Sequence, residues 1–260
     1  MSKRIEQEPI IRVEDVVAGY GDVTIFENVS FEVLRGEVFV ILGGSGCGKS
    51  TLLKNMIGLY RPFSGHVEID GEDIVSAEGA ARLRILRKIG VMYQQGALFG
   101  SMTLLENIEL PMEEFTDLPR EAMHRIASSK LKLVQLEGTE HRFPAEISGG
   151  MRKRAAMARA MALDPEILFL DEPSAGLDPI TSAELDDTIS RLARTLGITF
   201  VIVTHELASI YKIADRVIML DKEKKGIVAT GTPVELRDHC EIAWVRRFFR
   251  RETASGEVAA

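Results

Sequence analysis

A glycine-rich loop, set between an apolar strand and a helix, limits this chain to a small set of folds. The loop runs Gly43-Gly-Ser-Gly-Cys-Gly-Lys-Ser-Thr51. The apolar stretch 38–42 before it predicts a strand buried on both faces, and residues 52–57 after it predict a helix. Glycines let consecutive backbone N–H groups turn inward around an anion, and the helix N-terminus adds its dipole. A plain glycine-rich turn is the alternative, but the full spacing with a Lys-Ser pair predicts a P-loop in an α/β fold.

The residues of this loop are candidate ligands for ATP and Mg²⁺. Lys49 is expected to reach the β- and γ-phosphates, and the Ser50 hydroxyl is a candidate Mg²⁺ ligand. Cys47 is interpreted as a filler at a variable position. The residues of the loop that are expected to contact ATP are Gly43, Gly44, Ser45, Gly46, Cys47, Gly48, Lys49, Ser50 and Thr51.

An acidic pair follows a second apolar strand, Ile167-Leu-Phe-Leu-Asp171-Glu172. The strand delivers both carboxylates to its C-terminal end, where ligands bind in open α/β sheets. Asp171 is expected to hold Mg²⁺ through water, and Glu172 to take a proton from the attacking water. Two acids that only cap the next helix are the alternative. Because a P-loop is present in the same chain, the pair predicts ATP hydrolysis.

The remaining sequence alternates between β-rich and helical segments. Before residue 71 the apolar pattern predicts half-buried antiparallel strands. From about residue 96 to residue 162 it predicts helices, and afterwards the α/β pattern resumes. Caps and first-turn prolines mark the predicted helix starts. These starts are Thr103, Pro119, Ser148, Asp178 and Thr232.

Composition limits the partners of the chain. A formal net charge of −7 over 260 residues argues against a broad electrostatic footprint for nucleic acid. No apolar run reaches the length of a membrane span and no signal-peptide pattern opens the sequence. Any action at a membrane is therefore expected to go through a partner, from the cytoplasm. Cys47 and Cys240 lie far apart without metal-binding spacing, which fits a reducing compartment.

A third motif narrows the class of ATPase. Ile147-Ser-Gly-Gly-Met151 lies upstream of the acidic strand and resembles the signature motif of ABC ATPases, with Met151 in place of the usual Gln. A Ser-Gly-Gly turn that opens a helix exposes N–H groups and a hydroxyl to an anion, and a helix cap without a ligand is the alternative. In that family the anion is the γ-phosphate held by a second copy of the subunit. The resemblance therefore implies a homodimer in which Ser148, Gly149 and Gly150 act in trans.

Other motifs of ABC ATPases appear in the order of that family, over roughly residues 10 to 240. By this resemblance Tyr20 stacks on adenine, and Gln94 is the Q-loop glutamine, which contacts ATP and Mg²⁺. His205 resembles the switch histidine, and Asp178 resembles the D-loop residue that acts in trans. Asp178 also fits a plain N-cap before a proline. The implied catalytic residues are Glu172, His205, Gln94 and Lys49.

The implied fold is α/β: a P-loop NTPase of the ABC ATPase type, with an antiparallel β subdomain and an inserted α-helical subdomain. One ATPase domain is expected over residues 8–245, followed by a short C-terminal tail at 246–260. Within the domain, residues 8–95 and 163–245 are expected to form the nucleotide-binding core with its β subdomain. Residues 96–162 are expected to form the helical subdomain that carries the signature motif.

Three stretches resemble the MlaF-type ATPases of MCE phospholipid transporters: residues 93–99, 147–160 and 178–181. The resemblance implies an integral membrane permease of the MlaE type and an MCE protein of the MlaD type as partners, and no nucleic acid. It leaves a STAS-domain partner of the MlaB type open. The implied location is peripheral, at the cytoplasmic face of the inner membrane. The implied function is ATP-driven phospholipid transport between inner and outer membrane, which maintains outer-membrane lipid asymmetry.

Other functions within the ABC ATPases stay open from the sequence. Lipoprotein release and small-solute transport would use the same ATPase motifs. ABC ATPases that act on DNA or ribosomes usually carry long coiled coils or two tandem cassettes, and this sequence shows neither a heptad run nor an internal repeat.

Two cationic clusters remain outside these motifs. Arg152-Lys153-Arg154, inside the signature helix, is interpreted as a solvated face, with attraction to nucleotide phosphates as the alternative. Near the end of the chain, Trp244 and Phe248 fall four residues apart among arginines and predict a helix. Packing of this helix on its own domain, a clasp across a dimer and contact with a membrane surface are its three alternatives.

Overall fold

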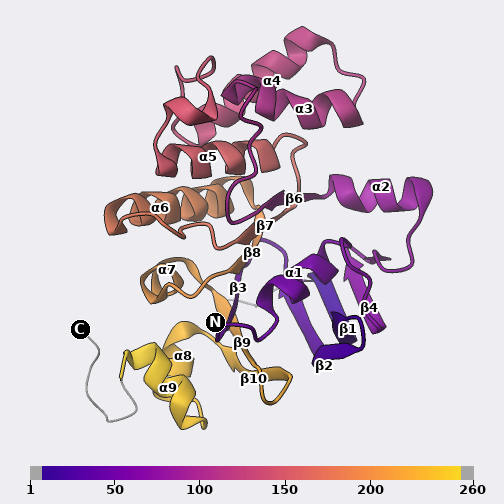
Figure 1. The fold of residues 1–260 in the computed structure, drawn as a ribbon, viewed down its shortest axis with the longest axis vertical. Coiled ribbons are helices and arrows are strands. Elements are labelled where there is room, and N and C mark those ends of the chain that lie inside the picture. Colours follow the sequence, from indigo (N-terminus) through magenta and orange to yellow (C-terminus); the bar gives the residue numbers. More distant parts are fainter. Residues whose placement is uncertain (1–7, 253–260) are drawn as a thin grey trace, which may run out of the picture. The chain divides into compact units, whose positions relative to one another are not determined.

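The computed structural model describes residues 8–252, and these form two compact units (Figure 1). The first unit contains residues 8–77 and 201–252, and the second contains residues 78–200. The chain leaves the first unit after Ala77 and returns to it within the strand β8 (Thr199–Val203).

An antiparallel sheet forms one layer of the first unit, with the strand order β2-β1-β4-β5. Its strands are β1 (Pro9–Tyr20), β2 (Val23–Leu34), β4 (Ser64–Ile69) and β5 (Glu72–Asp73). Ile11 of β1 lies opposite Val33 of β2 and Ile69 of β4, and all three side chains are buried. The sheet thus has the buried face that its alternating sequence predicts.

A second layer of the first unit contains β3 (Val38–Gly43), which runs parallel to β9 (Arg216–Asp221). The strand β10 (Gly226–Gly231) pairs antiparallel with β9. Arg216 donates to both carboxylate oxygens of the buried Glu37, at 2.7 and 2.8 Å. Such a bidentate pair fixes the start of β3 beside β9. The helices of this unit are α1 (Lys49–Met56), α7 (Leu207–Ile213), α8 (Pro233–Asp238) and α9 (Ala243–Arg250).

The second unit is mainly helical around two parallel strands. Its elements are α2 (Gly79–Arg87), β6 (Ile89–Met92), α3 (Leu104–Phe115), α4 (Arg120–Leu133), the short helix η1 (Pro144–Glu146), α5 (Gly149–Ala160), β7 (Ile167–Asp171) and α6 (Pro179–Leu196). The strands β6 and β7 pair in register from Ile89 opposite Ile167. A methyl group on Gly90 would lie 2.1 Å from the Ala160 carbonyl oxygen, so glycine lets the end of α5 pack directly on β6.

Four of the predicted helix starts, Thr103, Ser148, Asp178 and Thr232, are confirmed as N-caps whose side chains accept backbone hydrogen bonds. The helix α4 begins at Arg120, one residue after the predicted Pro119, and has no side-chain cap. Thr103 and Glu106 make a capping box at α3, and Thr232 and Glu235 make one at α8. The terminal helix α9 buries Val245 and Phe249, and the Tyr211 hydroxyl donates to the Phe249 carbonyl at 2.8 Å. The helix predicted near the end of the chain therefore packs on its own unit. None of the helices within residues 8–252 is both long and apolar enough to cross a bilayer.

Candidate functional site

The predicted P-loop connects β3 to α1 in the first unit, and its glycines are required by close packing. A methyl group on Gly43 would lie 2.4 Å from the Cys47 sulfur and 2.6 Å from the Leu220 carbonyl oxygen. Gly48 has φ 100°, and a methyl group there would lie 2.6 Å from the Ile25 side chain. The loop can therefore close in this form only with glycine at both ends.

Lys49 is folded back over the loop that precedes it. Its Nζ donates to the Gly43 carbonyl at 2.9 Å and to the Gly44 carbonyl at 3.2 Å. Residues 44–46 are exposed, and no atom of residues 8–252 outside the adjoining chain lies within 4 Å of a methyl group placed on Gly44 or Gly46. The loop thus presents accessible backbone and one ammonium group at the N-terminus of α1, which Gly48 leaves without a side-chain cap. This arrangement suits a phosphate group.

Cys47 is the buried residue of the loop. Only 3% of it is exposed, and burial raises the pKa of its thiol, although the charge of Lys49 acts in the opposite direction. A thiol with a raised pKa carries little thiolate at neutral pH. The structure is therefore consistent with Cys47 as a filler, as the sequence predicts.

Tyr20 lies beside the helix that follows the P-loop. Its hydroxyl is 3.0 Å from Thr51 Oγ1, and its ring meets the ring of Tyr60 edge to face, with 5.7 Å between centroids. The side chain of Lys54 lies over the Tyr60 ring at 5.2 Å. Tyr20 remains 46% exposed. Two aromatic rings and a cation therefore gather near α1, and Tyr60 is a member of this group that sequence reasoning missed.

His205 follows β8 in the first unit and is exposed. The buried Thr204 before it accepts a hydrogen bond from the Glu206 backbone N–H at 3.2 Å, which turns the chain sharply after the strand. His205 is therefore presented at the strand end, where the sequence predicts a functional histidine.

The acidic pair ends β7 in the second unit. Asp171 is the last residue of the strand, and Glu172 has φ 47°, a left-handed backbone that non-glycine residues rarely adopt. The Glu172 carbonyl accepts hydrogen bonds from the Ala175 N–H at 3.2 Å and from Lys153 Nζ at 3.4 Å. The backbone of the predicted base is thus held in a strained conformation from outside its own strand.

Gln94 lies just after β6, in the same unit, and is exposed. Lys153 Nζ donates to its backbone carbonyl as well as to that of Glu172. The structure therefore brings the Gln94 and Glu172 segments together through one side chain.

The signature turn opens α5, with Ser148 as its N-cap. Ser148 Oγ accepts a hydrogen bond from the Met151 N–H at 3.3 Å. A methyl group on Gly150 would lie 2.2 Å from the Thr181 side chain, so this glycine permits α5 to approach α6. Thr181 in turn donates through its hydroxyl to Asp178 at 2.6 Å. The signature turn and Asp178 are therefore neighbours within the second unit.

Asp178 is confirmed as the N-cap of α6. Its carboxylate accepts from the backbone N–H groups of Ile180 and Thr181, both at 3.1 Å. Hydrogen bonds from the Thr181 side chain and backbone, with a smaller one from Ile180, hold the pKa of Asp178 below its usual value.

One interpretation of the sequence was wrong. Lys153 is not on a solvated face: it is 8% exposed and points inward, while Arg152 beside it is exposed. The reason is the helical turn of about 100° per residue, which sends neighbouring side chains to different faces of α5.

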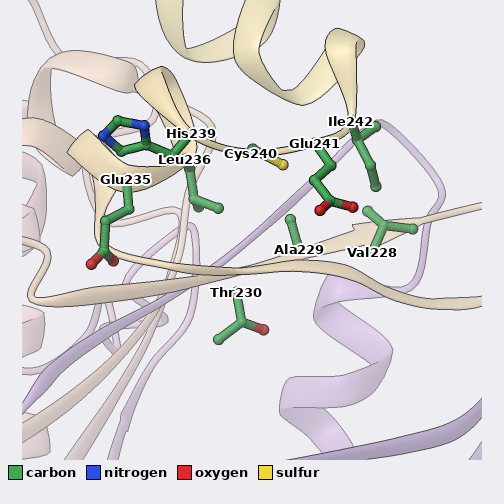
Figure 2. Close-up of a pocket in the computed structure, with 9 residues that line it drawn as sticks. All are labelled: Val228, Ala229, Thr230, Glu235, Leu236, His239, Cys240, Glu241 and Ile242. Carbon is green, nitrogen blue, oxygen red and sulfur yellow. The ribbon is translucent and has the colours of Figure 1, made fainter.

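A pocket of about 550 Å³ opens elsewhere in the first unit, between β10 and the α8–α9 region (Figure 2). Its lining in the described chain includes none of the predicted nucleotide-site residues. The lining residues are Val228, Ala229, Thr230, Glu235, Leu236, His239, Cys240, Glu241 and Ile242.

Together these loops define a class of protein. An ATP-binding cassette contains three such parts: a P-loop with a lysine folded back over it, an acidic pair at the end of a strand, and a Ser-Gly-Gly turn that caps a helix. The family described as ABC transporter matches residues 26–175, which is more than half of the chain. The chain belongs to the ABC transporter family.

Relatives of two kinds are similar to this chain over most of its length. The chain is 43% identical over 210 residues to a "Probable ribonucleotide transport ATP-binding protein mkl" of Mycobacterium leprae, covering 81% of this chain but only 60% of that relative. It is 38% identical over 228 residues to the "Intermembrane phospholipid transport system ATP-binding protein MlaF" of Escherichia coli K12. The second match covers 88% of this chain and 84% of MlaF.

Solved structures confirm the predicted α/β fold of the ABC ATPase type. The dimeric ATP-binding cassette MJ0796 bound to ADP and Pi is 30% identical, with a TM-score of 0.77 over 85% of this chain and 98% of that one. The cbiO1 protein of Clostridium perfringens, part of the ABC transporter complex cbiONQ, is 29% identical. Its TM-score is 0.82 over 90% of this chain and 92% of that one.

Proposed function

We propose that this chain hydrolyses ATP as the motor subunit of a transporter that moves phospholipid between the inner and outer membranes and so maintains outer-membrane lipid asymmetry. The observation that carries the ATPase part is the P-loop, in which Lys49 Nζ lies over exposed loop backbone at the start of α1. Similarity to MlaF over most of both chains supports the phospholipid part.

The first unit supplies the nucleotide contacts. Residues 43–51 bind the phosphates through backbone N–H groups and Lys49, because consecutive N–H groups and a cation complement their charge. Tyr20 stacks on the adenine through its exposed ring surface.

Three oxygen donors of the chain fit a Mg²⁺ ion. Mg²⁺ takes hard oxygen ligands and leaves most of its positions to water and substrate phosphates. The Ser50 hydroxyl, the Asp171 carboxylate and the Gln94 amide oxygen are donors of this kind, and Ser50 and Gln94 are exposed. These three residues would hold the ion. When bound, it neutralises charge on the phosphate oxygens.

Glu172 and His205 act on the reacting groups. Glu172 accepts a proton from the attacking water, which makes that water a better nucleophile. His205, which follows the turn after β8, donates a hydrogen bond to the γ-phosphate in this proposal.

Ser148, Gly149, Gly150 and Asp178 serve the nucleotide of a second copy in a homodimer. The helix cap at Ser148 and the carboxylate at Asp178 lie close together, joined through Thr181. The dimeric state of the related cassette MJ0796 supports this assembly. We further propose residues 8–245 as one ATPase domain, with 8–95 and 163–245 as core and 96–162 as helical subdomain. The tail is 246–260, of which residues 246–250 are helical.

The proposed partners follow from the phospholipid function. They are an MlaE-type permease and an MlaD-type MCE protein, with an MlaB-type STAS protein as a further candidate, and no nucleic acid. Docked on the permease, the chain lies peripherally at the cytoplasmic face of the inner membrane.

Copurification tests this assembly. The tagged chain, extracted in mild detergent from its native membrane, is expected to retain an integral membrane subunit and an MCE protein, identified by mass spectrometry. The Lys49→Ala variant is the matched control, because docking on a permease does not need ATP hydrolysis. Recovery of a lipoprotein-release or solute permease without an MCE protein contradicts the phospholipid function and leaves the ATPase function standing.

A second candidate cargo comes from the mkl relatives, whose name refers to ribonucleotide transport. Identity to them is higher, at 43%, but the match spans only 60% of their length. MlaF is matched over 84% of its length and is therefore the better template for the whole chain. Stimulation of the complex by a ribonucleotide other than the ATP that it hydrolyses, without stimulation by phospholipid, favours the second candidate.

Lys49→Ala is expected to weaken MgATP binding at least roughly tenfold and to lower hydrolysis with it. A hydrogen bond to a charged group contributes about 1.5–3 kcal/mol, and the variant removes the Lys49 ammonium that is folded over the loop. Isothermal titration calorimetry with MgATP measures the affinity. Lys222→Ala, an exposed lysine of the same unit, is the control. If the affinity and the rate of Lys49→Ala equal those of the wild type, Lys49 does not contact the phosphates.

A further inference from the structure

The helix α5 makes side-chain contacts with two loops of the proposed active site. Lys153 donates to the backbone carbonyls of Gln94 and Glu172, and Arg159 donates to those of Gly96 and Ala97, at 3.0 and 2.6 Å. An ammonium has three donors and no acceptor, so it can join carbonyls from different segments. Of these two cations, Lys153 contacts both the loop after β6, at Gln94, and the loop after β7, at Glu172.

The carbonyls that α5 contacts belong mainly to residues in left-handed conformations. Glu172 has φ 47°, Gly96 has φ 75° and Ala97 has φ 50°. Such conformations are unfavourable for residues other than glycine and persist only where surrounding groups hold them. Lys153 and the Ala175 N–H are the two donors to the Glu172 carbonyl described above, and Lys153 is the one that comes from a different segment.

The segment after Gln94 is seated closely on the same helix. A methyl group on Gly96 would lie 3.1 Å from the Ala156 side chain, and the Arg159 guanidinium lies 6.0 Å from the centre of the Phe99 ring. Lys153, Ala156 and Arg159 follow each other at three-residue spacing and so share one face of α5. This segment therefore has a defined position relative to Lys153.

The acidic pair also acts on Lys153 through its charge. Burial has the largest influence on the pKa of Lys153 and lowers it, while the charges of Glu172 and Asp171 act in the opposite direction.

We propose that Lys153 is a positioning residue for ATP hydrolysis: one buried ammonium fixes the Gln94 and Glu172 segments in a common geometry. The carboxylate of Glu172 is thereby directed toward the attacking water, and Gln94 keeps a fixed position relative to Glu172. This inference rests on the proposed ATPase function.

The test uses Lys153→Met, which keeps the length of the side chain and removes its donors. Steady-state phosphate release is expected to show kcat lowered at least about tenfold with the KM for MgATP within about twofold, because small misplacements of a catalytic group reduce the chemical step. Rates are expressed per nucleotide-binding site, so that loss of folded protein does not lower kcat. Arg154→Met is the matched control, because Arg154 is next along the helix and donates to the Gln135 side chain at 3.4 Å rather than to the Gln94 or Glu172 backbone.

A double-mutant cycle separates positioning from general damage. If Lys153 acts through Glu172, then Lys153→Met has no further effect on single-turnover hydrolysis when Glu172→Gln is already present. If the rate reductions of the two substitutions multiply in the double variant, the proposal is overturned. A wild-type kcat in folded Lys153→Met also overturns it. Should Lys153→Met fail to fold, Lys153→Gln replaces it, with kcat expected at least about threefold below wild type. Wild-type kcat in that variant overturns the proposal equally.

The outcomes also distinguish this inference from the function on which it rests. A wild-type chain that does not hydrolyse ATP, alone or with its membrane partners, contradicts the proposed function. A hydrolysing wild type with an inactive Glu172→Gln and a fully active Lys153→Met contradicts only the role of Lys153.

Discussion

Replacing Glu172 with glutamine is expected to lower kcat for ATP hydrolysis by about a thousandfold, within the range that general-base removal produces. Glutamine has nearly the shape of glutamate, so the left-handed backbone at this position and its contacts with Ala175 and Lys153 should survive. The amide cannot accept the proton of the attacking water. Phosphate release measures the rate, and MgATP affinity is expected to stay near that of the wild type.

Glu166→Gln is the matched control for this variant. Glu166 is exposed and lies just before the opposite end of the same strand, β7, so the chemical change is identical and the position differs. Its activity is expected to equal that of the wild type. Hydrolysis close to the wild-type rate in Glu172→Gln removes this carboxylate from the role of base.

Replacing Ser148 with arginine is expected to block hydrolysis by roughly a hundredfold or more while isolated monomers keep their affinity for ATP. Ser148 is exposed at the start of α5, and a long cation there obstructs the approach of a nucleotide held by a second subunit. Equilibrium binding to dilute protein measures the affinity, and phosphate release measures the rate. Loss of ATP binding by the monomer contradicts the shared site.

Two comparisons sharpen this second prediction. Thr232→Arg removes the N-cap of α8 in the same way and should keep full activity, which controls for cap loss. A mixture of Ser148→Arg and Lys49→Ala subunits should regain hydrolysis. Half of randomly formed dimers are mixed and each contains one intact site of two, so up to about a quarter of the wild-type rate is expected. A mixture as inactive as its components argues against loops acting across a dimer.

Local signals explain why much of the fold could be predicted from the sequence. The strand β3 is continuously apolar, and the starts of α3 and α8 are marked by capping boxes that form as expected. Helices α2 and α7 were missed for the opposite reason. Their N-cap residues, Glu78 and Glu206, make no side-chain cap.

The residues of the candidate site likewise divide into those that the sequence could predict and those that it could not. Residues in contiguous motifs could be found because the spacing of the P-loop and the acidic pair is dictated by backbone geometry. Tyr60 could not be found, since its contact with Tyr20 joins positions forty residues apart without a shared pattern. Lys153 did leave a signal. It lies three residues after the buried Gly150 and four before the buried Met157, which places it on the buried stripe of α5.

The contrast between the two cysteines makes the unaltered chain suitable for spectroscopy. Cys47 is buried and its thiol is mostly protonated at neutral pH, whereas Cys240 is partly exposed on the wall of a pocket (Figure 2). Thiol-directed dyes react with the thiolate and need access to it, so they attach to Cys240 first. A fluorophore placed there reports on the region between α8 and α9 without touching the P-loop and without any engineered substitution.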